Sequence, residues 1–291
     1  TLIGDGAADA LTTGSNNTVV GSGALSTATT ADNNIAVGFA ALAANTSGTS
    51  NTAVGTSALT ANTTASNNTA VGKGAADVNT TGTSLTAVGV NVLGANTTGS
   101  SNVGIGVDAL NSNTTASNNT AVGTNALDAN TTGGENTAVG LDALGANTTA
   151  ANNVAVGCAS LAANLAADNT AVGRAALEAN TTGTSNTAVG SRALDSNTTA
   201  AENTAVGAAS MTANTTGASN AAFGTDTLKS NTTGGSNTAL GAYSLDANTT
   251  ASYNTGVGVH ALGATTTGQQ NTAIGGESLD ANTTGGDNTA V

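Results

Sequence analysis

Few side chains in this sequence are suited to acid–base, nucleophilic or metal-ligand chemistry. His260 is the only histidine and Cys158 the only cysteine, and they stand many residues apart. A nucleophile needs an adjacent base, and a catalytic triad needs unlike groups that converge. One histidine and one cysteine provide neither a Ser-His-Asp nor a Cys-His arrangement. We therefore expect His260 to face solvent, Cys158 to be a free surface or subunit-facing thiol, and the chain not to be an enzyme.

Acidic side chains are more numerous, but their spacing does not suit a metal site. Asp and Glu total 17 against 4 Lys and Arg, which gives a net charge of −13. The acids recur irregularly, and no glycine- and aspartate-rich calcium-binding repeat is present. We assign no catalytic, cofactor-binding or metal residue and expect no cofactor. The acidic residues that follow a leucine or its equivalent include Asp128, Glu178, Asp195, Asp246 and Asp280.

Charge and hydropathy also restrict the partners. Nucleic-acid binding depends on basic side chains that contact phosphates, so the acidic balance disfavours it. The same balance disfavours binding to anionic membranes, and no apolar run approaches the length of a membrane span.

The element that must position these side chains is a 17-residue unit, N-T-A-V-G-x-x-A-L-x-A-N-T-T-G/A-x-x, whose residues we number as positions 1 to 17. The glycine at position 5 recurs every 17 residues, except that Gly157 is followed by Gly173 after 16. The missing residue falls within 164–168, where the N-T-T segment is interrupted. A deletion that leaves the next unit intact must lie in a turn, so we expect a bend there.

The repeat predicts strands rather than helices. Valine at position 4 and leucine at position 9 are the only sustained large apolar rows; they are five residues apart with a glycine between them, which does not fit a helix. T-A-V and A-L-x-A are typical of two short strands, in which neighbouring side chains point to opposite faces. Glycine at position 5 and the N-T-T segment would supply two bends.

Two strands and two bends per unit predict one coil of a parallel β-solenoid. We expect an all-β fold with a single continuous array of about 17 coils of 17 residues over residues 1–291. Valine, leucine and asparagine should each stack on their own kind from coil to coil, with asparagine amides bonded to one another.

The composition of the unit also predicts partner chains. One valine and one leucine per coil bury little apolar surface, while the ordering of every backbone residue costs free energy. The small residues at positions 3 and 8, such as Ala53 and Ala58, would form a second face that another chain can approach closely. We therefore expect an oligomeric rod, and a homotrimer suits a narrow coil.

The N-T-A-V-G-x-x-A-L-x-A segment resembles the head repeats of trimeric autotransporter adhesins, with Asn68, Val71 and Gly72 at the matching positions. Extra residues around N-T-T depart from that family and would enlarge one bend. The unit is more similar still to N-T-A-V-G-x-x-A-L-x-x-N-T-T-G arrays in phage-type tail fibres and bacterial surface proteins. The resemblance spans the chain. It implies a left-handed β-roll, a homotrimer and an extracellular location on a virion or a bacterial cell. We expect the array, which begins and ends within a unit, to be a fragment of a longer fibre.

These patterns favour a structural shaft of an extracellular fibre, a tail fibre or surface adhesin, that spaces or presents a receptor-binding tip. One alternative is ice binding by stacked threonine rows such as Thr63-Thr64, although adjacent threonines in a strand point to opposite faces. Another is direct attachment to a host-surface receptor through variable positions 6, 7 and 10, where no aromatic patch forms. N-T-T also fits the N-glycosylation pattern, which matters in a secreted eukaryotic protein. Residues that bear on these alternatives are the other threonine pairs Thr80-Thr81 and Thr97-Thr98, the scattered aromatics Phe39, Tyr243 and Tyr253, and the acceptor-pattern residues Asn62, Asn79, Asn96 and Asn130.

Overall fold

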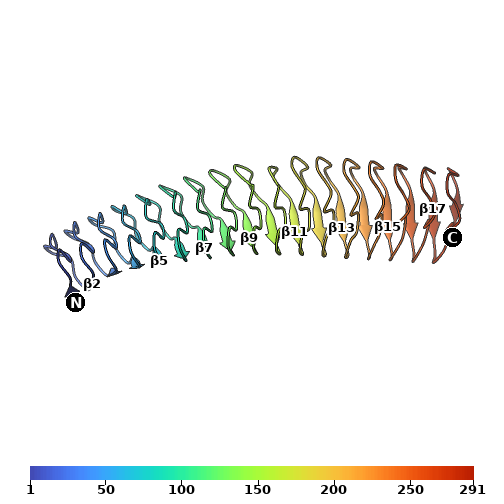
Figure 1. Ribbon diagram of the computed structural model, residues 1–291. Coiled ribbons are helices and arrows are strands. Elements are labelled where there is room, and N and C mark those ends of the chain that lie inside the picture. Colours follow the sequence, from blue (N-terminus) through green and yellow to red (C-terminus); the bar gives the residue numbers. More distant parts are fainter. The chain divides into compact units, whose positions relative to one another are not determined.

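The computed structural model describes all residues from 1 to 291 and contains strands but no helices. The chain forms two compact units, Thr1–Ala150 and Ala151–Val291. Each coil contributes one short strand, drawn as an arrow in Figure 1. The first unit contains β1 (Leu2–Ile3), β2 (Thr18–Val20), β3 (Ile35–Val37), β4 (Thr52–Val54), β5 (Thr69–Val71), β6 (Thr86–Val88), β7 (Val103–Ile105), β8 (Thr120–Val122) and β9 (Thr137–Val139). The second contains β10 (Val154–Val156), β11 (Thr170–Val172), β12 (Thr187–Val189), β13 (Thr204–Val206), β14 (Ala221–Phe223), β15 (Thr238–Leu240), β16 (Thr255–Val257), β17 (Thr272–Ile274) and β18 (Thr289–Ala290).

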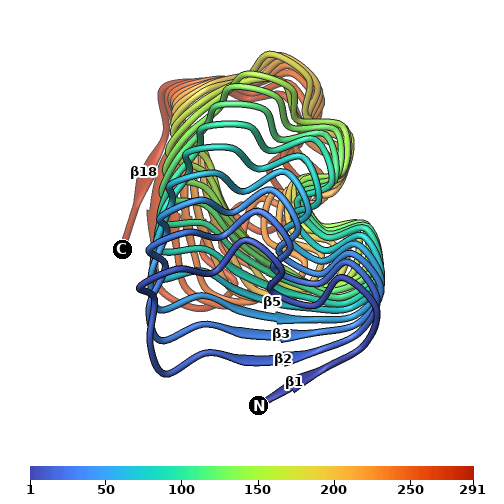
Figure 2. The same ribbon diagram turned by 90° about the vertical axis from the view of Figure 1, so that its left-hand side faces the viewer.

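Within each unit, successive strands pair in parallel and in register. Thr52 pairs with Thr69 and Val54 with Val71, one unit of sequence further on. Strands of the first unit lie side by side in Figure 2. In the second unit β10 pairs with β11 at a step of 16, Val154 with Thr170, and the bend between them absorbs the missing residue. The parallel β-solenoid and the turn at residues 164–168 are therefore confirmed.

The prediction of a second strand at A-L-x-A is wrong. Positions 6 to 11 form a turn, and the leucine at position 9 has a positive φ, +51° at Leu59. A residue in the left-handed region breaks the alternation of an extended chain, so Ala58 and Leu59 both point inward and both are fully buried. Left-handed backbone costs a leucine roughly 1–2 kcal/mol, and burial of its side chain gives about 1.5–3 kcal/mol in return.

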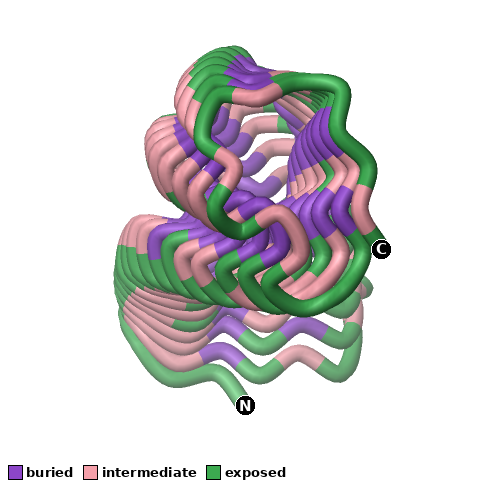
Figure 3. Tube along the Cα trace, turned by 90° about the vertical axis from the view of Figure 1, so that its right-hand side faces the viewer, coloured by how far each residue is buried: buried purple, intermediate pink, exposed green.

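The valine row does not form the core as expected. Each strand buries its middle residue, so Ala53 is fully buried while Val54 is half-buried at the surface. The core therefore consists of alanine at positions 3 and 8 and leucine at position 9, which recur at the same place in successive coils (Figure 3). The alanine rows expected to receive partner chains lie inside the coil, which removes the packing argument for a trimer.

Buried asparagines fasten each coil internally and to its neighbour. Asn62, at position 12, donates to Asn45 Oδ1 at 3.1 Å and to the Ala65 carbonyl at 3.0 Å. Asn51, at position 1, donates its side-chain amide across the interior to the same Ala65 carbonyl at 2.9 Å. Its backbone N–H donates to Asn34 Oδ1 at 2.9 Å. The expected asparagine ladders are confirmed, and they satisfy polar groups that no water reaches.

The position-5 glycine ends each strand where no other residue fits. Gly55 has φ +136°, and a Cβ there would lie 2.4 Å from the carbonyl oxygen of Gly72 in the next coil. The expected bend at position 5 is confirmed. The asparagine at position 12, by contrast, does not have positive φ; that conformation falls on positions 7, 9 and 17, for example Ser57 and Asn67.

Candidate functional site

The most regular surface in either unit is made by the outward residues of the strands. Each three-residue strand buries its middle side chain and presents the first and third, at positions 2 and 4, on one face. We call these two rows in each unit the strand face. Their members in the first unit are Thr18, Val20, Ile35, Val37, Thr52, Val54, Thr69, Val71, Thr86, Val88, Val103, Ile105, Thr120, Val122, Thr137 and Val139. In the second unit they are Val154, Val156, Thr170, Val172, Thr187, Val189, Thr204, Val206, Ala221, Phe223, Thr238, Leu240, Thr255, Val257, Thr272 and Ile274.

The strand face leaves apolar side chains partly in water. Val71 is 37% exposed and Val172 is 36% exposed, and the larger Leu240 reaches 50%. A single exposed apolar residue is ordinary, but an unbroken row of them is not. In most strands the face therefore pairs a threonine hydroxyl at position 2 with an apolar side chain at position 4, whereas β3, β7, β10 and β14 have no outward threonine.

The threonines of the strand face use none of their hydroxyl hydrogen-bonding capacity within the chain. No side-chain hydrogen bond joins Thr52, Thr69 or Thr86 to another residue. A hydroxyl has one donor hydrogen and two acceptor lone pairs, so each remains free to bond to an external group.

The N-T-T threonines behave differently, and we call positions 13 and 14 the threonine segment. Thr80, at position 13, donates its hydroxyl to the Thr97 carbonyl at 2.9 Å in the next coil. The backbone N–H groups of Thr80 and Thr81 donate to that same carbonyl at 2.9 and 3.2 Å. The position-14 side chain, such as Thr81, is exposed and its hydroxyl has no partner in the chain, while most position-13 hydroxyls donate to the next coil, so this segment presents one row of free hydroxyls.

Charge is absent from both of these regions. Every Asp, Glu, Lys and Arg of the sequence lies at position 6, 7, 10, 16 or 17 of its unit. Asp128, at position 10, is half-buried in the turn, and burial raises the pKa of its carboxyl. Burial likewise raises the pKa of Asp77 and Asp246. The backbone N–H of Ser15 donates to Asp32 Oδ1 at 2.6 Å and lowers the pKa of that carboxyl.

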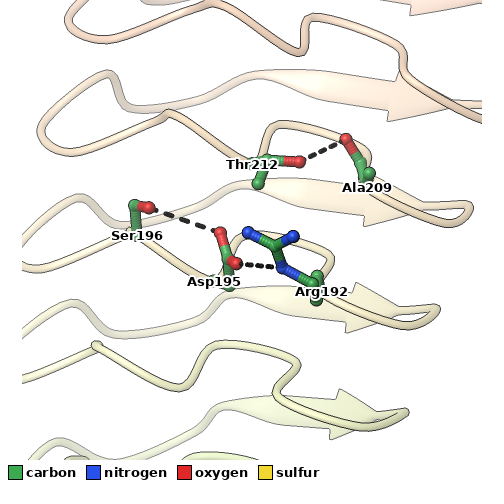
Figure 4. A network of polar contacts seen from close by, with 5 residues as sticks. All are labelled: Arg192, Asp195, Ser196, Ala209 and Thr212. Atoms are coloured by element: carbon green, nitrogen blue, oxygen red, sulfur yellow. Dashed lines mark hydrogen bonds and ion pairs between the residues drawn. The ribbon is translucent and has the colours of Figure 1, made fainter.

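The ion pairs of the charged turns join residues three apart in the same turn. Figure 4 shows Arg192 Nε donating to Asp195 Oδ2 at 2.8 Å, and the Ser196 hydroxyl donating to Asp195 Oδ1 at 3.3 Å. In the following coil the Thr212 hydroxyl donates to the Ala209 carbonyl at 2.5 Å. A surface ion pair of this kind contributes about 0–1 kcal/mol to stability, so it stabilises the turn slightly and does not form a binding site.

The two residues with the chemistry of catalysts lie apart. His260 is exposed at position 7 and its ring stacks on Tyr243, with centroids 5.0 Å apart and planes at 7°. Cys158 is an exposed free thiol. Asp246, Glu277 and Asp280 surround a shallow depression beside His260. No group of three or more His, Cys, Asp or Glu side chains is placed to hold a metal ion.

The strand face was not among the sites predicted from the sequence. Its signal was present in the T-A-V alternation, which places threonine and valine on one side of the strand, and in the lack of charge at positions 2 and 4. Hydropathy predicts that valine faces the interior, and in that orientation the threonine and valine of a strand would not form an outward face.

Comparison of the chain with protein-family models, with curated proteins and with solved structures finds no match in any of the three. The structure also contains no helix with the length and hydropathy needed to cross a membrane.

Proposed function

We propose that this chain is a structural shaft of an extracellular fibre, which spaces or presents a receptor-binding tip. The observation that carries the proposal is the closure of the coil. Asparagine, alanine and leucine side chains complete an interior in each coil, and each coil bonds mainly to its neighbours. In such an array the stability is close to a sum of coil and neighbour contributions, so coils can be added or removed without a new kind of contact.

The resemblance to adhesin heads and tail-fibre repeats supports the finer parts of the proposal. It favours a left-handed β-roll, a homotrimer, and a place on a virion or bacterial surface. The homotrimer now depends on the resemblance alone, because the alanine rows are buried within one chain. Equilibrium sedimentation of the full chain decides it: three times the 27.1 kDa chain mass supports the trimer, and the mass of one chain removes it.

Direct attachment to a host receptor is the weaker candidate. Positions 6, 7 and 10 are the variable part of the coil, and their side chains change charge and size from one coil to the next. The stacked pair Tyr243 and His260 occurs once. A specific interface usually concentrates aromatic and arginine anchors in one patch, and these positions do not.

A spacer is tested by its length. Fluorescent domains fused to the two ends of arrays with different coil numbers would report the distance between the ends by energy transfer. We expect that distance to increase linearly by about 4.8 Å for each coil added, the spacing of neighbouring strands. A distance that does not grow with coil number would contradict the shaft proposal.

A further inference from the structure

The strand face is a two-dimensional array of unused hydrogen-bonding groups and methyl groups. Along each unit the outward side chains repeat at the strand spacing of about 4.8 Å, and across a strand positions 2 and 4 lie about 6.6–6.8 Å apart. Three consecutive strands with the sequence T-A-V occur in each unit, β4 to β6 and β11 to β13. Threonine hydroxyls on these strands have no partner in the chain.

We propose that the strand face binds ice, which is a further activity beyond that of a shaft. Surface molecules of ice both donate and accept hydrogen bonds, as threonine hydroxyls do. Across these strands the hydroxyls form one row, in which they recur every ~4.8 Å, and a row of valines runs beside it. The valine methyl groups beside the hydroxyls cannot bond to water and instead order it around themselves.

Absence of charge on the strand face fits this partner. Ice is uncharged, and an ionised side chain at positions 2 or 4 would hold its own hydration shell against the lattice. All 21 charged side chains, 17 acidic and 4 basic, lie at other positions of the unit. The binding contributions of neighbouring threonines reinforce one another. Once one threonine is bound to the ice surface, the next is held close to its own binding position at high effective concentration.

A second copy of the chain is the competing occupant, and two features disfavour it. Each copy carries a net charge of −13 and the strand face has no basic side chain, so two copies paired at this face gain no charge complementarity. Pairing the faces would also remove rows of threonine hydroxyls from water, and a buried hydroxyl without a partner opposes association.

The threonine segment provides the matched control. Thr187, at position 2 of β12, and Thr199, at position 14, belong to the same coil, and neither hydroxyl bonds to the chain. Position 14 forms a single row beside hydroxyls already donated to carbonyls, as at Thr181, which bonds to the Thr198 carbonyl at 2.9 Å. Position 14 therefore lacks the row of valines that stands beside the threonines of the strand face.

The test is thermal hysteresis and ice-crystal shaping by the full chain and by Thr187→Tyr and Thr199→Tyr. We expect the full chain to depress freezing below melting and to facet ice crystals. Thr187→Tyr should lose about half or more of the hysteresis, since a gap of about 1 Å already forfeits up to half of the dispersion attraction of neighbouring groups. Thr199→Tyr should retain it. Equal unfolding midpoints establish that both variants are folded, and Thr204→Tyr on β13 repeats the test in the next strand if Thr187→Tyr does not fold.

Three results would overturn the proposal. The first is ordinary freezing behaviour of the full chain. The second is equal loss of hysteresis in Thr187→Tyr and Thr199→Tyr. The third is a sedimentation mass above one chain that Thr187→Tyr returns to one chain, which would assign the strand face to self-association.

Discussion

The strand face and the threonine segment both contain threonine in most coils, yet the two regions treat it in opposite ways. On the strand face the backbone is extended, its N–H and C=O groups pair with neighbouring strands, and the hydroxyl is left over. In the threonine segment the backbone bends, and the Thr97 carbonyl receives two N–H groups and a hydroxyl from the preceding coil. The conformation of the backbone, and not the residue type, decides whether a repeated hydroxyl is structural or available.

The largest effect is expected where the strand face ends. Replacing Gly123 by alanine puts a Cβ 2.4 Å from the Gly140 carbonyl oxygen at φ +137°. We expect a loss of about 3–5 kcal/mol in the free energy of unfolding, from backbone strain and the displaced neighbour together. Denaturant unfolding measures it.

Gly145→Ala is the control for that variant. Gly145 lies in the turn, has no positive φ, and its Cβ would meet the Asp142 carbonyl oxygen at an ordinary 3.4 Å. Its stability should change by less than about 1 kcal/mol. Similar losses in both variants would show that the strand end is not the special position.

The next largest loss of stability is expected at the buried asparagine that precedes the threonine segment. Asn130 donates to Asn113 Oδ1 at 3.0 Å and to the Gly133 carbonyl at 2.9 Å. Asn130→Ala leaves the Asn113 side-chain oxygen and the Gly133 carbonyl buried with fewer hydrogen bonds. It should lower the free energy of unfolding by about 2–4 kcal/mol, measured by thermal or denaturant unfolding. Asn111→Ala, in the turn at a residue with no positive φ and no side-chain hydrogen bond, should cost less than about 1 kcal/mol. Equal costs would contradict the role of the buried ladder.

The comparison itself is tested by paired threonine variants. Thr181→Val removes a hydroxyl that donates to the Thr198 carbonyl, and it should cost about 0.5–1 kcal/mol. Thr187→Val removes a hydroxyl without a partner from a strand, where valine is favoured, and it should be neutral or slightly stabilising. The two regions would be equivalent if both variants unfolded at the same denaturant concentration.

The smallest effect concerns pH. Burial raises the pKa of Asp128 above its ordinary 3.8, and the nearby charges of Asp142 and Asp108 raise it further. A raised folded-state pKa means that the native chain binds the proton more tightly than the unfolded chain. Asp128 therefore destabilises the fold at neutral pH, and this penalty disappears as pH falls through the folded and then the unfolded pKa.

Asp128→Asn should therefore raise the free energy of unfolding by a few tenths of a kcal/mol at pH 7, about the size of a solvent-screened interaction. Near pH 3 it should leave the free energy of unfolding unchanged. The comparison variant is Asp280→Asn, at the same position of another coil but exposed. A gain at pH 7 that persists unchanged at pH 3 would rule out this origin.

Much of the fold could be predicted from the period alone. The position-5 glycine, the asparagine ladders, the parallel stacking and the turn at 164–168 each follow from what one residue type can do at a repeated place. For the candidate site, the sequence predicts a bend at N-T-T, as the structure has it. Which of the two threonines keeps a free hydroxyl depends on the hydrogen bond from position 13 to the next coil, and the period does not reveal that bond.

Which face of each strand points into the coil was harder to predict. T-A-V alternation allows either valine or alanine to face inward, and hydropathy favours valine. The coil interior decides otherwise, because leucine and a second alanine already occupy it. Val92 at position 8 shows how little space remains: a Cβ on Gly104, at position 3 of the next coil, would lie 2.4 Å from its Cγ1. That paired exchange of large for small is visible in the sequence and indicates that positions 3 and 8 face each other.

The side-chain hydrogen bonds join residues close in sequence, and this affects how the chain responds to cleavage of a peptide bond. The widest of them joins residues 20 apart, Thr60 and the Ala40 carbonyl. A peptide bond broken in one threonine segment therefore leaves intact coils on both sides, each still held by its own asparagines. Cleavage at one coil is therefore expected to unfold that coil without unfolding the coils on either side of it.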